Sequence, residues 1–272
     1  MDGRGFQAGG RGRAQGISCW PNPGRRAGGC EQPDRGRRCR NRLELVPHLL
    51  HARTLALVTD LDLIPDWDEL ARRVGAAVRG GVGLVQVRAK ALDPQKQSRL
   101  ASLIVSVVGA RAQVVVNGDP EMARSSGAAG VHLPEISAGA SVSEVRSQLG
   151  PDALVGRSVH SSTAAVQAEA DGADYIFFGT VFPSRSHPGG PTSGVEGIAA
   201  TVNAVSVPVI GIGGITAANC RSVIDAGAVG VAAIGAIIGE YDSYRATRAL
   251  HGAMAGGRSH FKGGRAGGTA GR

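Results

Sequence analysis

The most unusual stretch of the sequence is VGRSVHSS, residues 155–162, where an apolar run ends in Arg157, Ser158, His160 and Ser161. Histidine exchanges a proton near neutral pH, so an imidazole among hydroxyl groups is a candidate general acid or base. A lone histidine at the end of an apolar run is also compatible with a structural role. We predict that His160 is the catalytic residue and that Ser158 helps to orient it.

A second polar set interrupts the apolar run VQVRAK, where Gln86, Arg88 and Lys90 alternate with apolar residues. Arginine and lysine can pair with an anionic group, and the glutamine amide can hydrogen-bond to it. The other interpretation is a charged loop that only faces water. Because a polar side chain inside an apolar run needs a partner, we expect these three residues to bind the substrate.

Three further polar residues have two interpretations each. Asn117 ends the run QVVVN and is expected either to contact the ligand or to cap the next helix. In GVHLPEIS, His132 is either a core residue or a ligand contact, and Glu135 lies on the adjoining loop. We include Asn117 among the expected substrate-binding residues and leave His132 and Glu135 open.

Two glycine-containing turns are candidate phosphate sites. Gly213 and Gly214 lie in IGGITAAN, and Gly235 and Ala236 lie in AIGAIIG; each segment links an apolar run to the start of a helix. Glycine lets backbone amides approach a ligand closely, and the start of a helix favours an anion. We therefore predict a phosphate at these two turns, although a pair of tight turns without a ligand would have the same sequence.

The elements that must position these residues alternate along the chain. Between longer amphipathic stretches lie eight short apolar runs, at residues 54–59, 83–88, 113–117, 130–133, 153–160, 175–179, 207–214 and 229–235. Strands that alternate with helices form a parallel sheet, and eight such units favour a closed (β/α)8 TIM barrel. An open doubly wound sheet would place a glycine-rich turn after the first strand, and VTDLDLIPDW has none.

The barrel interpretation has a consequence for the site, because the chemistry of such barrels lies at the carboxyl ends of the strands. The helices expected between the strands include residues 65–81, 162–173 and 216–228, with Ser or Thr at the start of the last two and Gly near their ends. Nearly every unusual polar residue named above falls at the carboxyl end of a predicted strand.

Charge divides the chain of 272 residues into three parts. The first 42 residues hold ten arginines against three acids and the last 22 hold four basic residues and no acid, although the whole formal charge is only +8. Between them, 16 basic residues face 19 acidic ones. Because the Gly/Arg-rich ends have little to bury, we predict disordered tails at 1–45 and 253–272 around one domain at 46–252.

Composition also limits the partners. Arg/Gly repeats can bind single-stranded nucleic acid, but these tails lack interleaved aromatic residues, so we expect no nucleic-acid partner. No apolar run approaches 18 residues and no secretory segment is recognisable, so we expect a cytoplasmic protein without a membrane partner. Cys19, Cys30 and Cys39 are too far apart for a Cys-x-x-Cys site, and Cys220 is expected to pack in a helix. A homo-oligomer is left open.

Six segments resemble, in this order, the thiamine phosphate synthase/TenI family: LVQVRAK, VVVNG, GVHLPEIS, GRSVHS, AVQAEADGADYIFFGTVFPS and VPVIGIGGITAAN. The resemblance spans about residues 54–250. It implies a TIM-barrel enzyme of thiamine biosynthesis that binds a thiazole phosphate as its small-molecule partner. One branch of the family, the synthases, joins hydroxymethylpyrimidine diphosphate to thiazole phosphate with the help of Mg2+. The TenI-like branch includes tautomerases that isomerise a carboxythiazole phosphate by proton transfer without a metal.

The chain departs from the synthase pattern at the residues linked to the metal. Synthases end the third strand in Asn-Asp, whereas Gly118 follows Asn117 here and Asp119 comes one position late. Ser137 stands where the second carboxylate of the pattern is expected. Because Mg2+ normally takes a carboxylate or two, we predict thiazole tautomerase activity, with thiamine phosphate synthase as the alternative. A non-catalytic regulator that binds a phosphate ligand is a second alternative.

The loop after the sixth strand departs from the pattern in a smaller way. Synthases carry Pro-Thr-x-Thr-Lys there, and the sequence PSRSH keeps hydroxyls at Ser184 and Ser186 but not the lysine. We expect both serines to bind the substrate. In the tautomerase interpretation Arg88 holds the carboxylate and neither a metal nor another cofactor is needed, whereas the synthase alternative requires Mg2+.

Overall fold

The structure is a computed structural model that describes residues 50, 53–135, 140–185 and 188–256. These residues belong to one compact unit, Arg40–Arg272. The predicted tail 1–45, Ser137, Ser186 and most of the predicted tail 253–272 lie outside the described residues.

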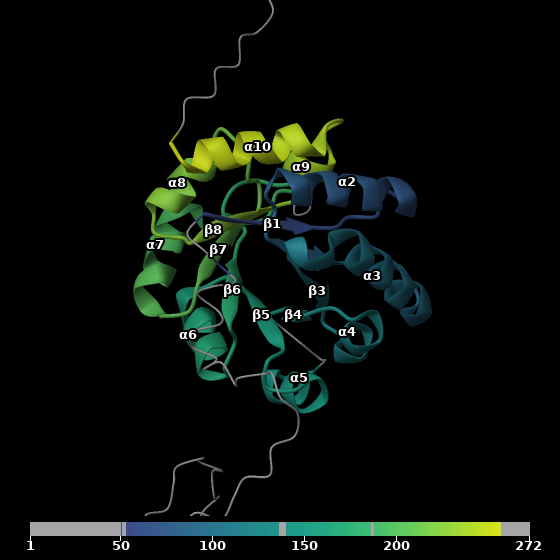
Figure 1. The fold of residues 1–272 in the computed structure, drawn as a ribbon. Helices are drawn as coiled ribbons and strands as arrows, with labels where there is room; N and C mark the ends of the chain where they lie inside the picture. The colour runs from purple at the N-terminus through teal and green to yellow at the C-terminus, as the bar shows by residue number, and fades with distance from the viewer. Residues whose placement is uncertain (1–49, 51–52, 136–139, 186–187, 257–272) are drawn as a thin grey trace, which may run out of the picture. The chain divides into compact units, whose positions relative to one another are not determined.

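Eight parallel strands close into a barrel in which each strand pairs with its neighbours in sequence and the last pairs with the first (Figure 1). The strands are β1 Thr54–Val58, β2 Leu84–Val87, β3 Gln113–Asn117, β4 Gly130–Leu133, β5 Leu154–Val159, β6 Tyr175–Phe178, β7 Val209–Ile212 and β8 Gly230–Ala233. All eight runs predicted from the sequence are strands, and the predicted TIM barrel is confirmed. The register is parallel throughout, so the carboxyl ends of all eight strands meet at one rim.

Helices cover the outside of the barrel (Figure 1). They are α2 Trp67–Gly80, α3 Pro94–Val108, the short 3-10 helix η1 Gly109–Arg111, α4 Pro120–Ser126, α5 Val142–Leu149, α6 Ser162–Ala170, α7 Gly194–Ala204, α8 Cys220–Asp225, α9 Gly235–Ile238 and α10 Ser243–Met254. The last helix, α10, runs to Met254, two residues past the predicted boundary at 252, and the Met254 side chain is buried.

Local sequence signals explain where the helices begin and end. Ser161 caps α6, because its hydroxyl accepts a hydrogen bond from the Ala164 amide at 3.1 Å. The helix predicted from residue 216 begins only at Cys220. Asn219 accounts for the difference: its Oδ1 accepts from the Thr216 amide at 2.8 Å and its Nδ2 donates to the Gly214 carbonyl at 2.9 Å, which closes a turn before the helix.

The core has two layers separated by the strands. One set of strand side chains packs outward against the helices, together with residues such as Leu70, Ile104 and Cys220. The alternate set fills the barrel interior and includes Leu84 and Phe177. Cys220 is a free, fully buried thiol, which confirms its predicted place in helix packing. No helix in the described part of the chain is long and apolar enough to cross a membrane.

Candidate functional site

A row of polar side chains crosses four neighbouring strands inside the barrel. Gln86 on β2, Asn117 on β3, His132 on β4 and Ser158 on β5 have the parity of the interior residues, and Asn117 pairs with His132 in the strand register. The Gln86 amide nitrogen donates to the Asn117 side-chain oxygen at 3.0 Å. The structure therefore brings together two of the residues that were expected to bind the substrate.

His132 belongs to the interior of the barrel and is 1% exposed. Its Nε2 lies 2.9 Å from the Ser158 hydroxyl and its Nδ1 lies 3.1 Å from the Tyr175 hydroxyl. The Phe177 ring lies against the imidazole, with 4.3 Å between ring centroids. Burial lowers the pKa of His132 to about 3, so its imidazole is neutral at physiological pH. Of the two interpretations left open by the sequence, the core position is the one observed.

Ser158 pairs with His132, and this contact differs from the expected one with His160. The residue that the structure places against His160 is Glu135, in the loop after β4. The Glu135 carboxylate accepts from the His160 backbone amide at 3.2 Å through Oε1, and its Oε2 lies 2.5 Å from Nδ1 of the imidazole. The described side chain that contacts the His160 ring is therefore that of Glu135, which the sequence had left open, while Ser158 contacts His132.

Arg157 does not join the polar groups inside the barrel, although it lies between them in the sequence. Its guanidinium faces outward, where Nη2 donates to the Glu135 backbone oxygen at 3.2 Å and Nη1 lies 3.5 Å from the Asp171 carboxylate. Alternation along β5 explains this placement, since residues one apart point to opposite faces of a strand. Ser161 is likewise occupied as the cap of α6.

Arg88 and Lys90 follow β2 at the rim. Among the described residues, no carboxylate or carbonyl pairs with either side chain. The backbone of Arg88 is held on both sides by the fully buried Thr59: the Arg88 amide donates to the Thr59 hydroxyl at 2.8 Å, and that hydroxyl lies 3.2 Å from the Arg88 carbonyl. Thr59 was not predicted as a site residue, although its hydroxyl comes directly after the first strand.

The turn after β7 packs against the loop after β6. The Val181 amide donates to the Ile212 carbonyl at 2.9 Å and the Phe182 amide donates to the Gly213 carbonyl at 3.0 Å. Gly213 and Gly214 have φ angles of 103° and 63°, which favour glycine. A Cβ on Gly213 would lie 2.6 Å from Cγ2 of Thr180, and one on Gly214 would lie 2.7 Å from the Phe182 carbonyl. Packing therefore requires both glycines, whether or not a phosphate binds there.

The turn after β8 is different, because a Cβ on Gly235 would meet no atom within 4 Å. Gly235 and Ala236 begin α9, so their amides face outward from the first turn of a short helix. Ser184, in the loop after β6, has a buried hydroxyl that no described residue hydrogen-bonds. Ser184 follows Phe182 by two residues, which brings it close to the β7 turn; Ser186 lies outside the described residues.

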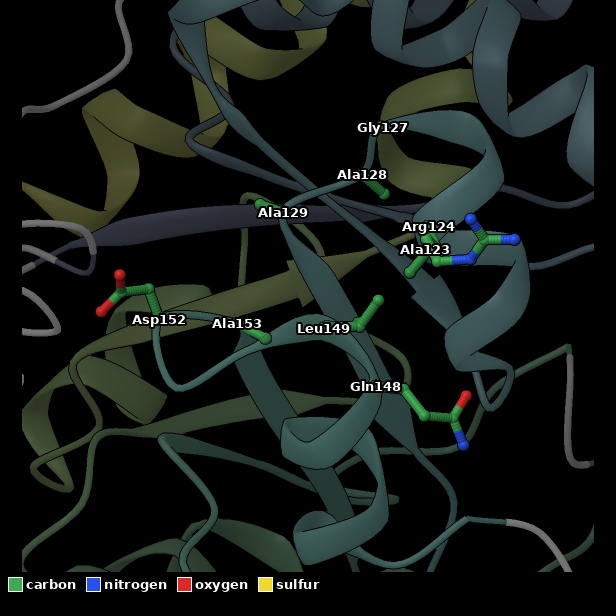
Figure 2. A pocket seen from close by; sticks show the side chains of 9 residues that line it. All are labelled: Ala123, Arg124, Gly127, Ala128, Ala129, Gln148, Leu149, Asp152 and Ala153. Carbon is green, nitrogen blue, oxygen red and sulfur yellow. The ribbon is translucent and has the colours of Figure 1, made fainter. Parts of the chain in front are cut away.

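A cavity of about 360 Å3 lies far from these groups, at the amino-terminal ends of β4 and β5 (Figure 2). Its lining comes from the ends of α4 and α5 and from the residues that lead into the two strands: Ala123, Arg124, Gly127, Ala128, Ala129, Gln148, Leu149, Asp152 and Ala153. Conserved chemistry in TIM barrels belongs to the opposite end. We therefore place the candidate site at the rim and not in this cavity.

The carboxylates at the rim that could bind a magnesium ion already have other partners. Gly118 follows Asn117, and the Asp119 carboxylate caps α4 by accepting from the Glu121 amide at 2.9 Å. Both carboxylate oxygens of Glu135 contact His160. Among the described residues, no group of three or more His, Cys, Asp or Glu side chains could hold a metal ion. These residues do not fit a magnesium site built from a pair of protein carboxylates.

Comparison with known proteins identifies the family. Residues 55–237 match the family model TMP-TENI, thiamine monophosphate synthase. The thiamine-phosphate synthase of Roseiflexus sp. (strain RS-1) is 39% identical over 184 residues, which are 67% of this chain and 77% of that protein. The thiamine biosynthesis bifunctional protein ThiED of Geobacter sulfurreducens is 42% identical over 193 residues, 70% of this chain and 38% of that longer protein. This chain thus spans less than half the length of the bifunctional relative.

A solved structure agrees with these sequence matches. The thiamine phosphate pyrophosphorylase from Pyrococcus furiosus superposes with a TM-score of 0.68 at 29% identity, covering 76% of this chain and 98% of that one.

These comparisons contradict the prediction that thiazole tautomerase is the main activity. Relatives 39–40% identical carry the name thiamine-phosphate synthase, which was the alternative. The prediction gave the missing carboxylates more weight than the retained Gln86, Arg88 and Lys90. By the resemblance, both activities use the same barrel and a site for the phosphate of a thiazole, so the motifs at the rim could not separate them. The chain is an enzyme, and it belongs to the thiamine monophosphate synthase (TMP-TENI) family.

Proposed function

We propose that the chain is a transferase, a thiamine-phosphate synthase that joins hydroxymethylpyrimidine diphosphate to thiazole phosphate. The observation that supports this most is the relative with that name, which is 39% identical over 184 residues, 67% of this chain and 77% of that protein. Arg88 and Lys90 at the rim also support this proposal. No described carboxylate neutralises either side chain, so both are available to bind a diphosphate.

In this reaction the bond between the pyrimidine methylene carbon and the diphosphate oxygen breaks, and its electron pair leaves on the diphosphate. The ring nitrogen of the thiazole then bonds to the methylene carbon. The chain has to hold the two substrates in line and to stabilise the charge that develops on the leaving group. Magnesium brought in by the diphosphate would supply charge neutralisation, and the side chains of this chain proposed to stabilise the same charge are those of Arg88 and Lys90.

The parts of the proposed site divide this work. The amides at Gly235 and Ala236, together with those at Gly213 and Gly214, would bind the phosphate of the thiazole. Gln86 and Asn117, joined to each other inside the barrel, would hydrogen-bond to the pyrimidine, and Arg88 with Lys90 would hold the diphosphate. Ser184 has a buried hydroxyl available for a substrate oxygen.

The direct test is an assay of the full chain with both substrates and Mg2+, following thiamine phosphate by its thiochrome fluorescence and the release of pyrophosphate. We expect the two products in equal amounts. Arg88→Ala should reduce kcat/KM by about 100-fold, since charge-assisted hydrogen bonds contribute about 1.5–3 kcal/mol. Arg124→Ala is the matched control, because that arginine lines the cavity at the other end of the barrel. Absence of both products from a folded wild-type chain would overturn the proposal.

A further inference from the structure

Glu135 and His160 form a pair at the ends of two neighbouring strands. One carboxylate of Glu135 binds His160 twice, at the backbone amide through Oε1 and at Nδ1 through Oε2. Two contacts from one rigid carboxylate fix both the position of the residue and the rotation of its ring. Because a carboxylate only accepts hydrogen bonds, Nδ1 must carry the proton in this contact.

The other nitrogen of the ring is left for a ligand. Nε2 has no hydrogen-bond partner among the described residues, and the His160 side chain is 58% exposed. When the ring is protonated, Nε2 also bears a hydrogen and is a donor to an anion. The pair thus presents one defined atom at the rim, on the end of the barrel where the diphosphate is proposed to bind.

The surroundings hold Glu135 without neutralising its carboxylate. Arg157 donates to the backbone oxygen of Glu135 at 3.2 Å, and the same guanidinium lies 3.5 Å from Asp171. Behind the pair, a small cavity of about 90 Å3 is lined by Glu135, Arg157 and residues of α6. Of the charged groups described around His160, only the Glu135 carboxylate contacts the imidazole; Arg157 and Asp171 contact each other.

We infer that Glu135 is a positioning residue that fixes His160 so that its Nε2–H donates to the leaving diphosphate. This inference rests on the proposed synthase function and deepens it. As the methylene–oxygen bond breaks, the electron pair stays on the diphosphate oxygen and the proton of Nε2 passes to that oxygen. His160 is left neutral with Nδ1–H still donated to Glu135, and solvent returns the proton after the diphosphate has gone. The pair adds a proton donor at a rim where, among the described residues, no group of three or more His, Cys, Asp or Glu side chains could hold a metal ion.

Kinetics of four variants test the inference. Glu135→Gln keeps an acceptor for the His160 amide but removes the charge, and should lower kcat by about 10- to 100-fold without changing KM for the thiazole phosphate. His160→Asn, with an amide nitrogen near the Nδ1 position, should lose about 10²–10⁴-fold in kcat. His160→Gln, with an amide nitrogen near the Nε2 position, should retain more activity than His160→Asn. Glu144→Gln is the control, with the same charge change in the capping box of α5.

The double variant Glu135→Gln/His160→Gln shows whether Glu135 affects kcat by positioning His160 or independently of it. If Glu135 acts through His160, the double variant has the kcat of His160→Gln alone. Additive losses, a wild-type kcat for Glu135→Gln, or equal activity of the two His160 variants would each overturn the inference.

A spectroscopic measurement tests the pair even if the synthase assay fails. In the ¹⁵N spectrum of the imidazoles of the full chain, His160 should carry its proton on Nδ1, and pyrophosphate should shift the Nε2 resonance. Glu135→Gln should abolish the preference for Nδ1–H. A wild-type spectrum with the proton on Nε2 alone, or without any response to pyrophosphate, refutes the inference. Lack of turnover with both spectral signatures present refutes only the proposed reaction.

Discussion

The Nε2 atom of His132 lies 2.9 Å from the hydroxyl of Ser158, across the pairing of β4 with β5. On its other side the imidazole reaches the Tyr175 hydroxyl at 3.1 Å. Burial raises the pKa of Tyr175 and lowers that of His132, so neither group is charged at neutral pH. The barrel interior therefore holds a neutral hydrogen-bonded set directly beneath the rim, where a charged imidazole would have no counter-ion.

The buried His132 should make the protein less stable in acid. Its pKa is about 3 in the folded chain and 6.5 in the unfolded chain, so only the unfolded chain takes up its proton between these values. The stabilisation is complete above pH 6.5 and is lost as the pH falls toward 3, with a slope of at most about 1.4 kcal/mol per pH unit. Urea denaturation of wild type and His132→Gln over this range should give a stability difference that shrinks with falling pH. A difference independent of pH would contradict this account.

Gly156 should be indispensable for packing inside the barrel. A Cβ at this position would overlap the ring of Tyr175, which is fully buried. We expect Gly156→Ala to lower the free energy of unfolding by about 1–3 kcal/mol, as overpacking does in other cores. Gly252→Ala in α10 is the control, since its Cβ would meet no atom within 4 Å and alanine favours a helix. Equal stability of the two variants would show that the Tyr175 ring can move aside.

Thr59 should be required for the function of Arg88. Thr59→Val removes the hydroxyl that binds the Arg88 amide and leaves that amide without its acceptor. We expect a loss of about 1–3 kcal/mol in stability and an increased KM for the pyrimidine diphosphate. Thr59→Ser keeps the hydroxyl and should keep the wild-type KM. Steady-state kinetics of the folded variants measure both values, and an unchanged KM in Thr59→Val would exclude the role.

Arg73 should stabilise the turn after β8 through hydrogen bonds to the end of α9. Its Nη1 donates to the carbonyls of Ile238 and Glu240, at 2.7 and 2.9 Å, at the end of α9. Arg73→Ala should lower stability by about 1–3 kcal/mol and raise KM for the thiazole phosphate. Arg72→Ala is matched, because Arg72 shares the partner Glu69 but is largely exposed and contacts none of these carbonyls. If both variants change stability and KM equally, the effect comes from the contact with Glu69 and not from the hydrogen bonds to the end of α9.

The sequence predicted the barrel because alternation of apolar runs and amphipathic helices is a local signal that repeats eight times. Two contacts of the site could also have been predicted from strand alternation and strand order. Ser158 and Arg157 differ by one position, so only one of them could face the interior. Glu135 and His160 follow neighbouring strands, and barrel closure alone places their loops side by side.

Other features could not be predicted from the sequence. The turn from Thr216 to Asn219 depends on hydrogen bonds of one side chain, which override a plausible helix start. Gly213 and Gly214 must be glycines because a Cβ at either position would collide with Thr180 or Phe182, residues that lie far from them in the sequence. The type of reaction was misjudged because the two branches of the family share one fold and a site for the phosphate of a thiazole.

The polar row on β2 to β5 and the two glycine turns after β7 and β8 lie in separate, consecutive segments of the chain. Residues 84–160 carry the groups proposed to recognise the pyrimidine and its diphosphate, and residues 175–238 carry those proposed to bind the thiazole phosphate. The two sets of residues are joined in the chain by the α6 connection between β5 and β6, so each set can change by substitutions within its own segment. In a barrel divided in this way, substitutions within residues 84–160 can change which second substrate is bound. The glycine turns proposed to bind the thiazole phosphate then keep their sequence.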